Sequence, residues 1–279
     1  MAKLGLVAGG GSLPLEIAEH CRRTGRPLFV VRLKGFAEPA LSGFDGADVG
    51  LAELGKCIKA LQRSACRAVC LAGQVNRPDF AKLAPDLRGL AALPAAILAS
   101  RKGDDALLRF LLGEFEREGF AIEGAEAVMG ELRLPRGPLG RHAPTPEQLA
   151  DAEQAMTVAR AIGSLDIGQG AVVCDGLVLA VEAQEGTDAM LARVAGLPAH
   201  LRGGEGDRRG VLAKVPKPIQ ETRVDLPTMG LATVRGAATA GLAGIVGEAG
   251  RLLVLDRSEA VALADELGLF VLGVEPQDG

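Results

Sequence analysis

Aromatic side chains are scarce in this chain of 279 residues, which contains eight Phe but no Trp and no Tyr. Proteins that bind single-stranded nucleic acids usually stack several bases on aromatic rings. The formal net charge of −4 and the pI near 5.6 also differ from the basic surface expected of a nucleic-acid-binding protein. The composition therefore argues against a general nucleic-acid binder, while a local basic patch could still hold a phosphorylated ligand.

Metal-binding and disulfide patterns are also missing. The five cysteines form no Cys-x-x-Cys pair, and the three histidines are far apart in the sequence, so no zinc-site spacing is present. An odd number of cysteines and no secretory signal at the start predict reduced thiols in a cytoplasmic protein.

Long apolar runs are absent as well, because the longest uncharged ones have about ten residues and a membrane-spanning helix needs roughly 20. Any membrane contact should therefore be peripheral, from the surface. Residues 88–99 are apolar and contain Pro94. We interpret this segment as buried packing, with an acyl-chain contact or a membrane-surface segment as the alternative.

The first half of the chain alternates between short apolar runs and helical patterns. Strands are predicted at residues 3–8, 28–33 and 67–72, with a possible last strand at 124–129. Helices are predicted at residues 13–24, 51–64 and 104–118. Such alternation indicates a parallel sheet covered on both faces, that is, a Rossmann-like α/β domain.

A boundary is predicted at residues 134–146, where four Pro and two Gly occur within 13 residues. We expect an N-terminal Rossmann-like nucleotide- or substrate-binding domain at residues 1–135 and a linker at 136–146. The C-terminal catalytic domain, at residues 147–279, should be mixed α/β.

The second half begins with a predicted helix at residues 147–162 and a hairpin around Asp175-Gly176, a dipeptide typical of two-residue turns. A strand is predicted at residues 210–215. Within 226–247 we expect a helix with Thr239, Leu242 and Val246 on one side. Residues 252–274 read as a strand, a helix and a strand forming a βαβ unit.

The glycine loop Gly9–Ser12 lies between a predicted strand and a predicted helix, where free backbone N–H groups favour an anion. The dinucleotide-binding fingerprint fits poorly, because Pro14 replaces its third glycine. Arg32 or Lys34 stands where an acidic residue is expected. A phosphate-binding loop and a tight turn that needs glycine torsions remain equal alternatives.

Two further segments carry polar side chains at positions where parallel sheets hold ligands. Gln74, Asn76 and Arg77 follow the strand at 67–72 and could contact a base, ribose or sugar. Asp104 and Asp105 begin a predicted helix, where one should act as a helix cap and the other could reach a ligand.

Acidic and basic residues concentrate between residues 182 and 227. The carboxylates of Glu182, Glu185, Asp188 and Asp225 would suit a hard cation such as Mg²⁺. The cations Lys214, Lys217 and Arg223 would suit phosphate. Alternatively, Thr187 and Asp188 cap a helix, the glutamates are solvated, and Asp225 pairs with a neighbouring cation. Together the residues suggest Mg²⁺-assisted phosphoryl chemistry.

Six motifs, at residues 7–14, 73–75, 103–105, 166–169, 182–188 and 214–227, resemble the LpxI-type UDP-2,3-diacylglucosamine pyrophosphatases. The likeness runs nearly end to end. Its most specific parts are the Glu-Gly-Thr-Asp turn at residues 185–188 and the Asp-Leu-Pro segment at 225–227.

The resemblance implies a two-domain, Mg²⁺-dependent cytoplasmic enzyme of lipid A biosynthesis in a Gram-negative bacterium. It would hydrolyse UDP-2,3-diacylglucosamine to UMP and 2,3-diacylglucosamine 1-phosphate (lipid X), with water attacking the β-phosphorus. The substrate would lie between the domains. The oligomeric state stays open, with a homodimer as one option.

We assign the main role to Asp225, as metal ligand or general base. The other candidate catalytic residues are Asp188, Lys214 and Arg223. The candidate metal ligands are Asp225, Asp188 and Glu182. The candidate substrate-binding residues are Gly10, Gly11, Ser12, Gln74, Asn76, Arg77, Asp104, Gln169, Thr187, Lys217, Gln220 and Thr228.

Two other functions compete with this reading. A nucleotide-linked oxidoreductase could be built on the first sheet, although Pro14 and Arg32 argue against it. A nucleotide-lipid sensor or carrier would bind the same ligand without consuming it, and its acidic cluster would merely be solvated.

Overall fold

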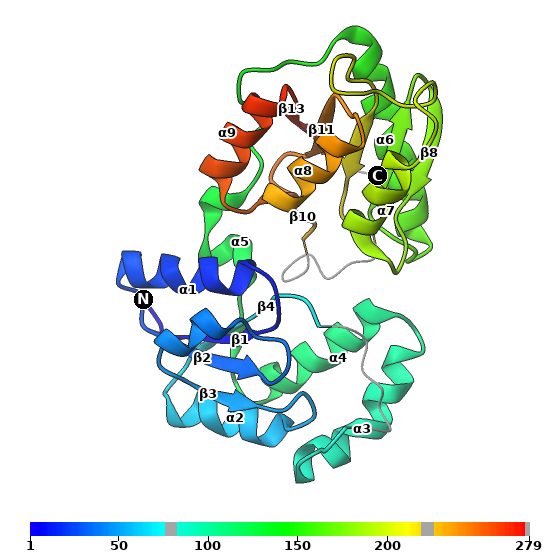
Figure 1. Cartoon of the computed structure of the whole chain (residues 1–279). Coiled ribbons are helices and arrows are strands. Elements are labelled where there is room, and N and C mark those ends of the chain that lie inside the picture. Colours follow the sequence, from blue (N-terminus) through cyan, green and yellow to red (C-terminus); the bar gives the residue numbers. More distant parts are fainter. Residues whose placement is uncertain (76–82, 219–225, 277–279) are drawn as a thin grey trace. The chain divides into compact units, whose positions relative to one another are not determined.

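The computed structural model describes residues 1–75, 83–218 and 226–276, which group into two compact units. The first unit contains Met1–Gly130 and the second begins at Glu131. Both contain helices and strands, as the alternating sequence pattern predicts (Figure 1).

The first unit is built on a five-stranded sheet with the order β3-β2-β1-β4-β5, in which every neighbouring pair is parallel. The strands are β1 (Leu4–Ala8), β2 (Leu28–Leu33), β3 (Gly46–Val49), β4 (Ala68–Ala72) and β5 (Ala121–Ile122). All five residues of β1 are buried, as expected for a central parallel strand covered on both faces. This order confirms the predicted Rossmann-like sheet.

The helices of the first unit are α1 (Leu13–Thr24), α2 (Leu54–Arg63), α3 (Leu87–Ser100), α4 (Asp104–Arg117) and α5 (Ala125–Val128), with a 3₁₀ turn η1 (Pro39–Gly43). Side chains of α2 and α4 pack on the sheet in one cluster with Val7, Val31 and Val69. The predicted helices at 13–24, 51–64 and 104–118 are thus confirmed to within a few residues.

One prediction for the first unit was wrong, and one strand was missed. Residues 124–129 contain the short helix α5, and the last strand is β5 just before it. The strand β3 was missed because its sequence, Gly-Ala-Asp-Val, has no apolar run to mark it. Its pairing with β2 defines it as a strand, and a partner strand leaves no local sequence signal.

The second unit contains a six-stranded mixed sheet in the order β6-β13-β11-β9-β7-β8. The strands are β6 (Gly137–Leu139), β7 (Gly170–Cys174), β8 (Leu177–Val181), β9 (Val211–Lys214), β11 (Gly244–Glu248) and β13 (Phe270–Val274). Strands β9, β11 and β13 run parallel, and β6, β7 and β8 pair antiparallel with their neighbours. The Pro-rich segment at 136–146 supplies β6, where Pro138 is tolerated because the strand lies at a sheet edge.

Within the described part of the second unit, four helices cover this sheet: α6 (Pro146–Ser164), α7 (Gly186–Ala195), α8 (Leu231–Thr239) and α9 (Arg257–Leu267). Apolar residues of α6 pack with one face of the sheet. Residues of α7, α8 and α9 pack with the other, so helices and sheet form three layers (Figure 1). The helix α6 begins with a capping box between Thr145 and Gln148.

The predicted hairpin is confirmed, with Asp175 and Gly176 both at positive φ between β7 and β8. The backbone N–H groups of both residues donate to the buried carboxylate of Asp151 on α6, at 3.0 and 2.8 Å. The turn is thereby fixed to the helix that covers it.

Two predictions for the second unit were wrong. The helix α8 ends at Thr239, so Leu242 lies beyond it and Val246 belongs to β11. The expected βαβ unit at 252–274 is not one sheet: β12 (Leu253–Val254) pairs with β10 (Thr228–Met229), and β13 pairs with β11. Periodicity predicts strands but not their partners, and these pairings join segments distant in sequence.

Candidate functional site

Lys214 ends strand β9, in the middle of the second unit's sheet, and its side chain is almost completely buried. Its ammonium donates hydrogen bonds to Thr187 Oγ1 at 2.7 Å and to the carbonyl oxygen of Thr228 at 2.8 Å. Three elements, β9, α7 and β10, therefore meet at one buried positive charge.

A carboxylate completes this network from the end of β8. Thr187 donates its hydroxyl proton to Glu182 Oε1 at 2.7 Å, and the Gln169 backbone N–H donates to Glu182 Oε2 at 3.3 Å. Glu182 is 6% exposed. The hydroxyl of Thr187 thus accepts from Lys214 and donates to Glu182, which fixes all three side chains. We call Glu182, Thr187 and Lys214 the lysine network.

Burial lowers the pKa of Lys214, while the negative charges of Glu182 and Asp188 act in the opposite direction. Asp188 lies in the first turn of α7 and is exposed. A buried ammonium held in place by hydrogen bonds has a fixed position, a property of charged groups that stabilise anionic transition states.

Glycines allow the chain to approach Glu182 closely. A Cβ on Gly168 would lie 2.1 Å from the Glu182 carbonyl oxygen, and one on Gly170 would lie 2.8 Å from Glu182 Oε2. Between them, Gln169 has a buried Oε1 with no hydrogen-bond partner among the described residues. The Gly-Gln-Gly spacing in the sequence is the local signal of this approach.

Lys217 lies three residues after Lys214 but interacts with a side chain outside the lysine network. Its Nζ lies 2.7 Å from Asp166 Oδ1, and both side chains are partly exposed. Asp166 has a positive φ of 57°, a left-handed conformation that Asp tolerates.

The two predicted loops of the first unit lie side by side, as their positions at one sheet edge suggested. Gly10 and Gln74 exchange two backbone hydrogen bonds of 2.9 Å, and a Cβ on Gly9 would lie 2.6 Å from the Gln74 carbonyl oxygen. Gly11 and Ser12 are exposed at the tip of the glycine loop. The hydroxyl of Ser12 donates to Glu16 on α1 at 3.3 Å.

Several predicted residues cannot be placed in either site. Asn76, Arg77, Gln220, Arg223 and Asp225 lie outside the described residues. Asp104 begins helix α4. Their assigned roles stay predictions.

The metal ligands stay a prediction as well. Within residues 1–75, 83–218 and 226–276, no group of three or more His, Cys, Asp or Glu side chains is arranged to hold a metal ion. A site completed by Asp225 would involve a residue beyond this range. Of the other two candidates, Asp188 is exposed, whereas both carboxylate oxygens of Glu182 already accept hydrogen bonds. Asp188 therefore fits the role of a metal ligand better than Glu182 does.

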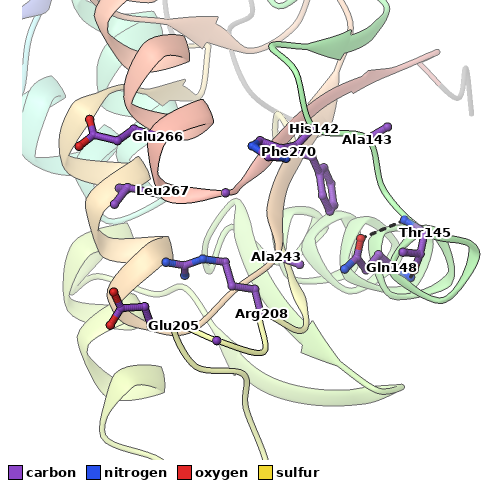
Figure 2. Close-up of a pocket in the computed structure, with 12 residues that line it drawn as sticks. His142, Ala143, Thr145, Gln148, Glu205, Arg208, Ala243, Glu266, Leu267 and Phe270 are labelled. Atoms are coloured by element: carbon purple, nitrogen blue, oxygen red, sulfur yellow. Dashed lines mark hydrogen bonds between the residues drawn. The ribbon is translucent and has the colours of Figure 1, made fainter.

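The second unit also has a hollow of about 580 Å³ that the sequence did not reveal (Figure 2). His142, Arg208 and Phe270 line it, together with the capping residues Thr145 and Gln148. Arg208 precedes β9 and Phe270 begins β13, so the hollow lies at the amino ends of the parallel strands. Lys214 lies at the opposite, carboxyl edge, where ligands of open α/β sheets bind.

Comparison with known families matches both units. Residues 3–132 match the model of the LpxI N-terminal domain, and residues 135–272 match that of the LpxI C-terminal domain. A relative from Caulobacter vibrioides, named UDP-2,3-diacylglucosamine pyrophosphatase LpxI, is 66% identical over 278 residues. The alignment covers 100% of this chain and 99% of the relative.

Solved structures are more distant. CobK precorrin-6A reductase is 15% identical with a TM-score of 0.32, over 100% of this chain and 89% of its own. The N5-carboxyaminoimidazole synthase of Aspergillus clavatus is 15% identical with a TM-score of 0.25, over 66% and 41% of the two chains. Neither likeness carries an argument, whereas the two domain matches and the full-length relative do: the chain belongs to the LpxI family.

Proposed function

We propose that this chain is a UDP-2,3-diacylglucosamine pyrophosphatase, which hydrolyses its substrate to UMP and 2,3-diacylglucosamine 1-phosphate in lipid A biosynthesis. The observation that carries the proposal is the 66% identity over the full chain to a relative named for this activity. Because the alignment spans both units, the likeness is not limited to one shared module.

The chemistry requires a fixed positive charge. Water attacking a diphosphate must approach in line with the leaving group, and the charge on the non-bridging oxygens must be neutralised. Lys214 is suited to the second task, because its ammonium is anchored by Thr187 and by the Thr228 carbonyl. Glu182 in turn holds Thr187, which makes Glu182 a positioning residue in this mechanism.

Asp225 is the candidate general base or metal ligand, and Arg223 would add a second positive charge on the phosphates. A Mg²⁺ ion, if bound by Asp188 and Asp225, would supply further charge neutralisation at the diphosphate. We expect water to attack the β-phosphorus, which leaves UMP as the departing group. In the first unit, the adjoining Gly10 and Gln74 loops are the candidates for the uridine diphosphate side.

The location and assembly of the enzyme are proposed on chemical grounds. A substrate with two acyl chains and a nucleotide head favours a cytoplasmic enzyme that contacts the inner membrane peripherally. Among the described residues, no helix is long and apolar enough to cross a bilayer. A homodimer remains a prediction that light scattering would decide.

The test is a product assay. Purified protein is incubated with UDP-2,3-diacylglucosamine in Mg²⁺ or in EDTA, and UMP and the lipid 1-phosphate are quantified. We expect both products in equal amounts with Mg²⁺ and neither in EDTA. Full activity in EDTA would remove the metal from the mechanism, and binding without turnover in Mg²⁺ would favour a sensor or carrier.

The same reaction in ¹⁸O-labelled water identifies the phosphorus that is attacked. We expect the heavy oxygen in the sugar 1-phosphate. Label in UMP would instead establish attack at the α-phosphorus.

A further inference from the structure

Helix α3 exposes a continuous apolar face, against the sequence interpretation that this segment is buried. Leu87, Leu90 and Leu98 are 90%, 57% and 59% exposed. The exposed positions of the helix are Leu87, Leu90, Ala91, Pro94, Ala95 and Leu98. Their spacing of three and four residues places all six on one side, and we call this set the α3 stripe.

The opposite side of α3 is fixed to the first unit. Asp86 caps the helix by accepting from the Gly89 N–H at 2.8 Å, and its second oxygen accepts from the Lys56 N–H of α2 at 2.7 Å. Arg88 lies 3.1 Å from Glu114 and 2.6 Å from Glu118 at the end of α4. Because these contacts set the rotation of the helix, the stripe is held outward.

Close packing at the helix start supports the same orientation. A Cβ on Gly89 would lie 1.9 Å from the carbonyl oxygen of Ala52, so the helix approaches the α2 region at backbone distance. Only glycine allows this approach. Figure 1 shows α3 beside α4, which packs against it.

The charges around the stripe indicate what covers it. Between residues 89 and 100 the chain has no charged side chain, and the two residues that follow the helix, Arg101 and Lys102, are both exposed cations. The nearest cation at the other end, Arg88, is neutralised by its two glutamates. An apolar face bordered by two exposed cations complements a bilayer with anionic headgroups.

The length of α3 is compatible with lying on a membrane and not with crossing it. Its 14 residues span roughly 21 Å, whereas the hydrocarbon core of a bilayer is about 30 Å thick. A helix of this kind lies in the plane of the interface, with its apolar side in the acyl region.

We propose that the α3 stripe docks the protein on the surface of an anionic lipid bilayer, with Arg101 and Lys102 at the headgroups. The inference rests on the proposed function, because a substrate with two acyl chains resides in such a bilayer. Pairing with a second copy of α3 fits less well. A parallel pair would bring the four exposed cations of the two copies together.

The test uses the full-length protein and vesicles of phosphatidylethanolamine with phosphatidylglycerol. The variant Leu90→Glu/Leu98→Glu introduces two charges on the stripe at exposed positions, where folding should tolerate them. The matched control is Leu177→Glu, since Leu177 is 54% exposed on β8 of the second unit. Circular dichroism and thermal melts establish that both variants are folded.

We expect wild type and the control to sediment with the vesicles, and the double variant to bind at least about tenfold more weakly. Replacing the vesicles with pure phosphatidylcholine, or changing Arg101 and Lys102 to Gln, should also weaken binding. If wild type fails to sediment, or if the double variant binds as well as wild type, the proposal is overturned.

An activity measurement separates docking from substrate binding. On substrate embedded in vesicles, the double variant should lose at least about tenfold in rate, in line with its weaker docking. On a monomeric short-chain analogue its rate should equal that of wild type. Equal losses on both substrates would overturn the proposal and assign the stripe to acyl-chain binding.

Two further outcomes are distinguishable. If light scattering shows a dimer that the double variant dissociates while vesicle binding is unchanged, the stripe is a subunit interface and the proposal fails. If wild type hydrolyses neither the vesicle-embedded substrate nor the short-chain analogue, the proposed function fails, and sedimentation still decides the docking.

Discussion

Each unit contains an exception to the rule that charged side chains are exposed and apolar side chains are buried, and the two exceptions are of opposite kinds. The second unit buries a lysine at the end of a central strand, whereas the first unit exposes three leucines on one side of a helix. Moving an ammonium out of water is costly unless it is paired and hydrogen-bonded. Leaving a leucine exposed forgoes about 1.5–3 kcal/mol of burial.

The fold compensates the buried charge of the second unit but not the exposed apolar face of the first. Lys214 has two hydrogen-bond partners and nearby carboxylates, so part of its desolvation is offset within the unit, although burial still lowers its pKa. The α3 stripe has no such compensation among the described residues, and its cost is offset only when something outside the unit covers it. We propose that the hydrogen-bonded Lys214 belongs to the reaction site and that the uncovered α3 stripe is a docking surface.

The largest effect is expected from Lys214→Met, which tests whether the buried lysine of the second unit takes part in the reaction. Removing the buried charge should lower kcat by about 10²–10³-fold, because a preorganised group that stabilises transition-state charge is lost. Since burial lowers the pKa of Lys214, protonation favours the unfolded chain at neutral pH. The double variant Lys214→Met/Glu182→Gln also removes the carboxylate that Lys214→Met would leave without its cation. We therefore expect the unfolding free energy of the double variant to be close to that of wild type.

Steady-state kinetics and urea unfolding of the single and double variants check this prediction. A kcat within tenfold of wild type would remove Lys214 from the chemistry. A large stability loss in the double variant would instead make the lysine structural.

Thr187→Val should have a smaller effect, a fall of roughly 10- to 100-fold in kcat, because Lys214 keeps its charge and loses one anchor. Thr187→Ser keeps the hydroxyl and is the matched control. It should restore most of the activity, since the hydrogen bonds to Lys214 and Glu182 can still form. If serine and valine were equally impaired, the methyl group and not the hydroxyl would matter.

The first unit can be probed from the inner side of α3. Arg88→Ala leaves Glu114 buried with Arg117 as its remaining ion-pair partner, so unfolding free energy should fall by roughly 1–2 kcal/mol. Leu90→Glu/Leu98→Glu on the outer side should change it by less than about 0.5 kcal/mol. Urea titrations of the three proteins compare the two sides. Equal losses would show that the stripe packs against the protein.

The smallest effect is expected at the cysteines, which are all buried and free. Burial raises the pKa of Cys57 to about 12 and that of Cys174 to about 11. At pH 8 the folded protein should therefore hold almost no thiolate and react negligibly with a disulfide reagent such as DTNB, whereas all five thiols react in denaturant.

The same pKa shifts fix the direction of the pH effect on stability. Raised thiol pKa values mean that the folded chain keeps protons which the unfolded chain releases. The stabilisation is complete below pH 9, the ordinary pKa of a thiol, and is lost as pH rises toward 11–12. Rapid native labelling at pH 8 would contradict the burial of these side chains.

Much of the fold was readable from local patterns. Strand–helix alternation predicted the parallel sheet of the first unit, and Asp175-Gly176 predicted the β7–β8 hairpin. Motif resemblance indicated the family that the domain matches then showed. These succeeded because apolar periodicity and turn chemistry act over a few neighbouring residues.

The candidate site was readable only in part. The sequence marked Lys214, Glu182 and Thr187 as polar residues near one another in the chain's second half, and the structure joins them in one network. The order of the strands brings Glu182 close to Thr187 and Lys214 close to the Thr228 carbonyl oxygen. No local pattern encodes those distances.

The sequence by itself determined most of the helices and strands, the turn at Asp175 and the family of this protein. Only the tertiary structure decided that Lys214 is inside and that the leucines of α3 are outside. The same apolar helix would be a core helix if covered and a docking surface if not. Burial is a property of what packs against a residue, and those neighbours come from distant parts of the chain.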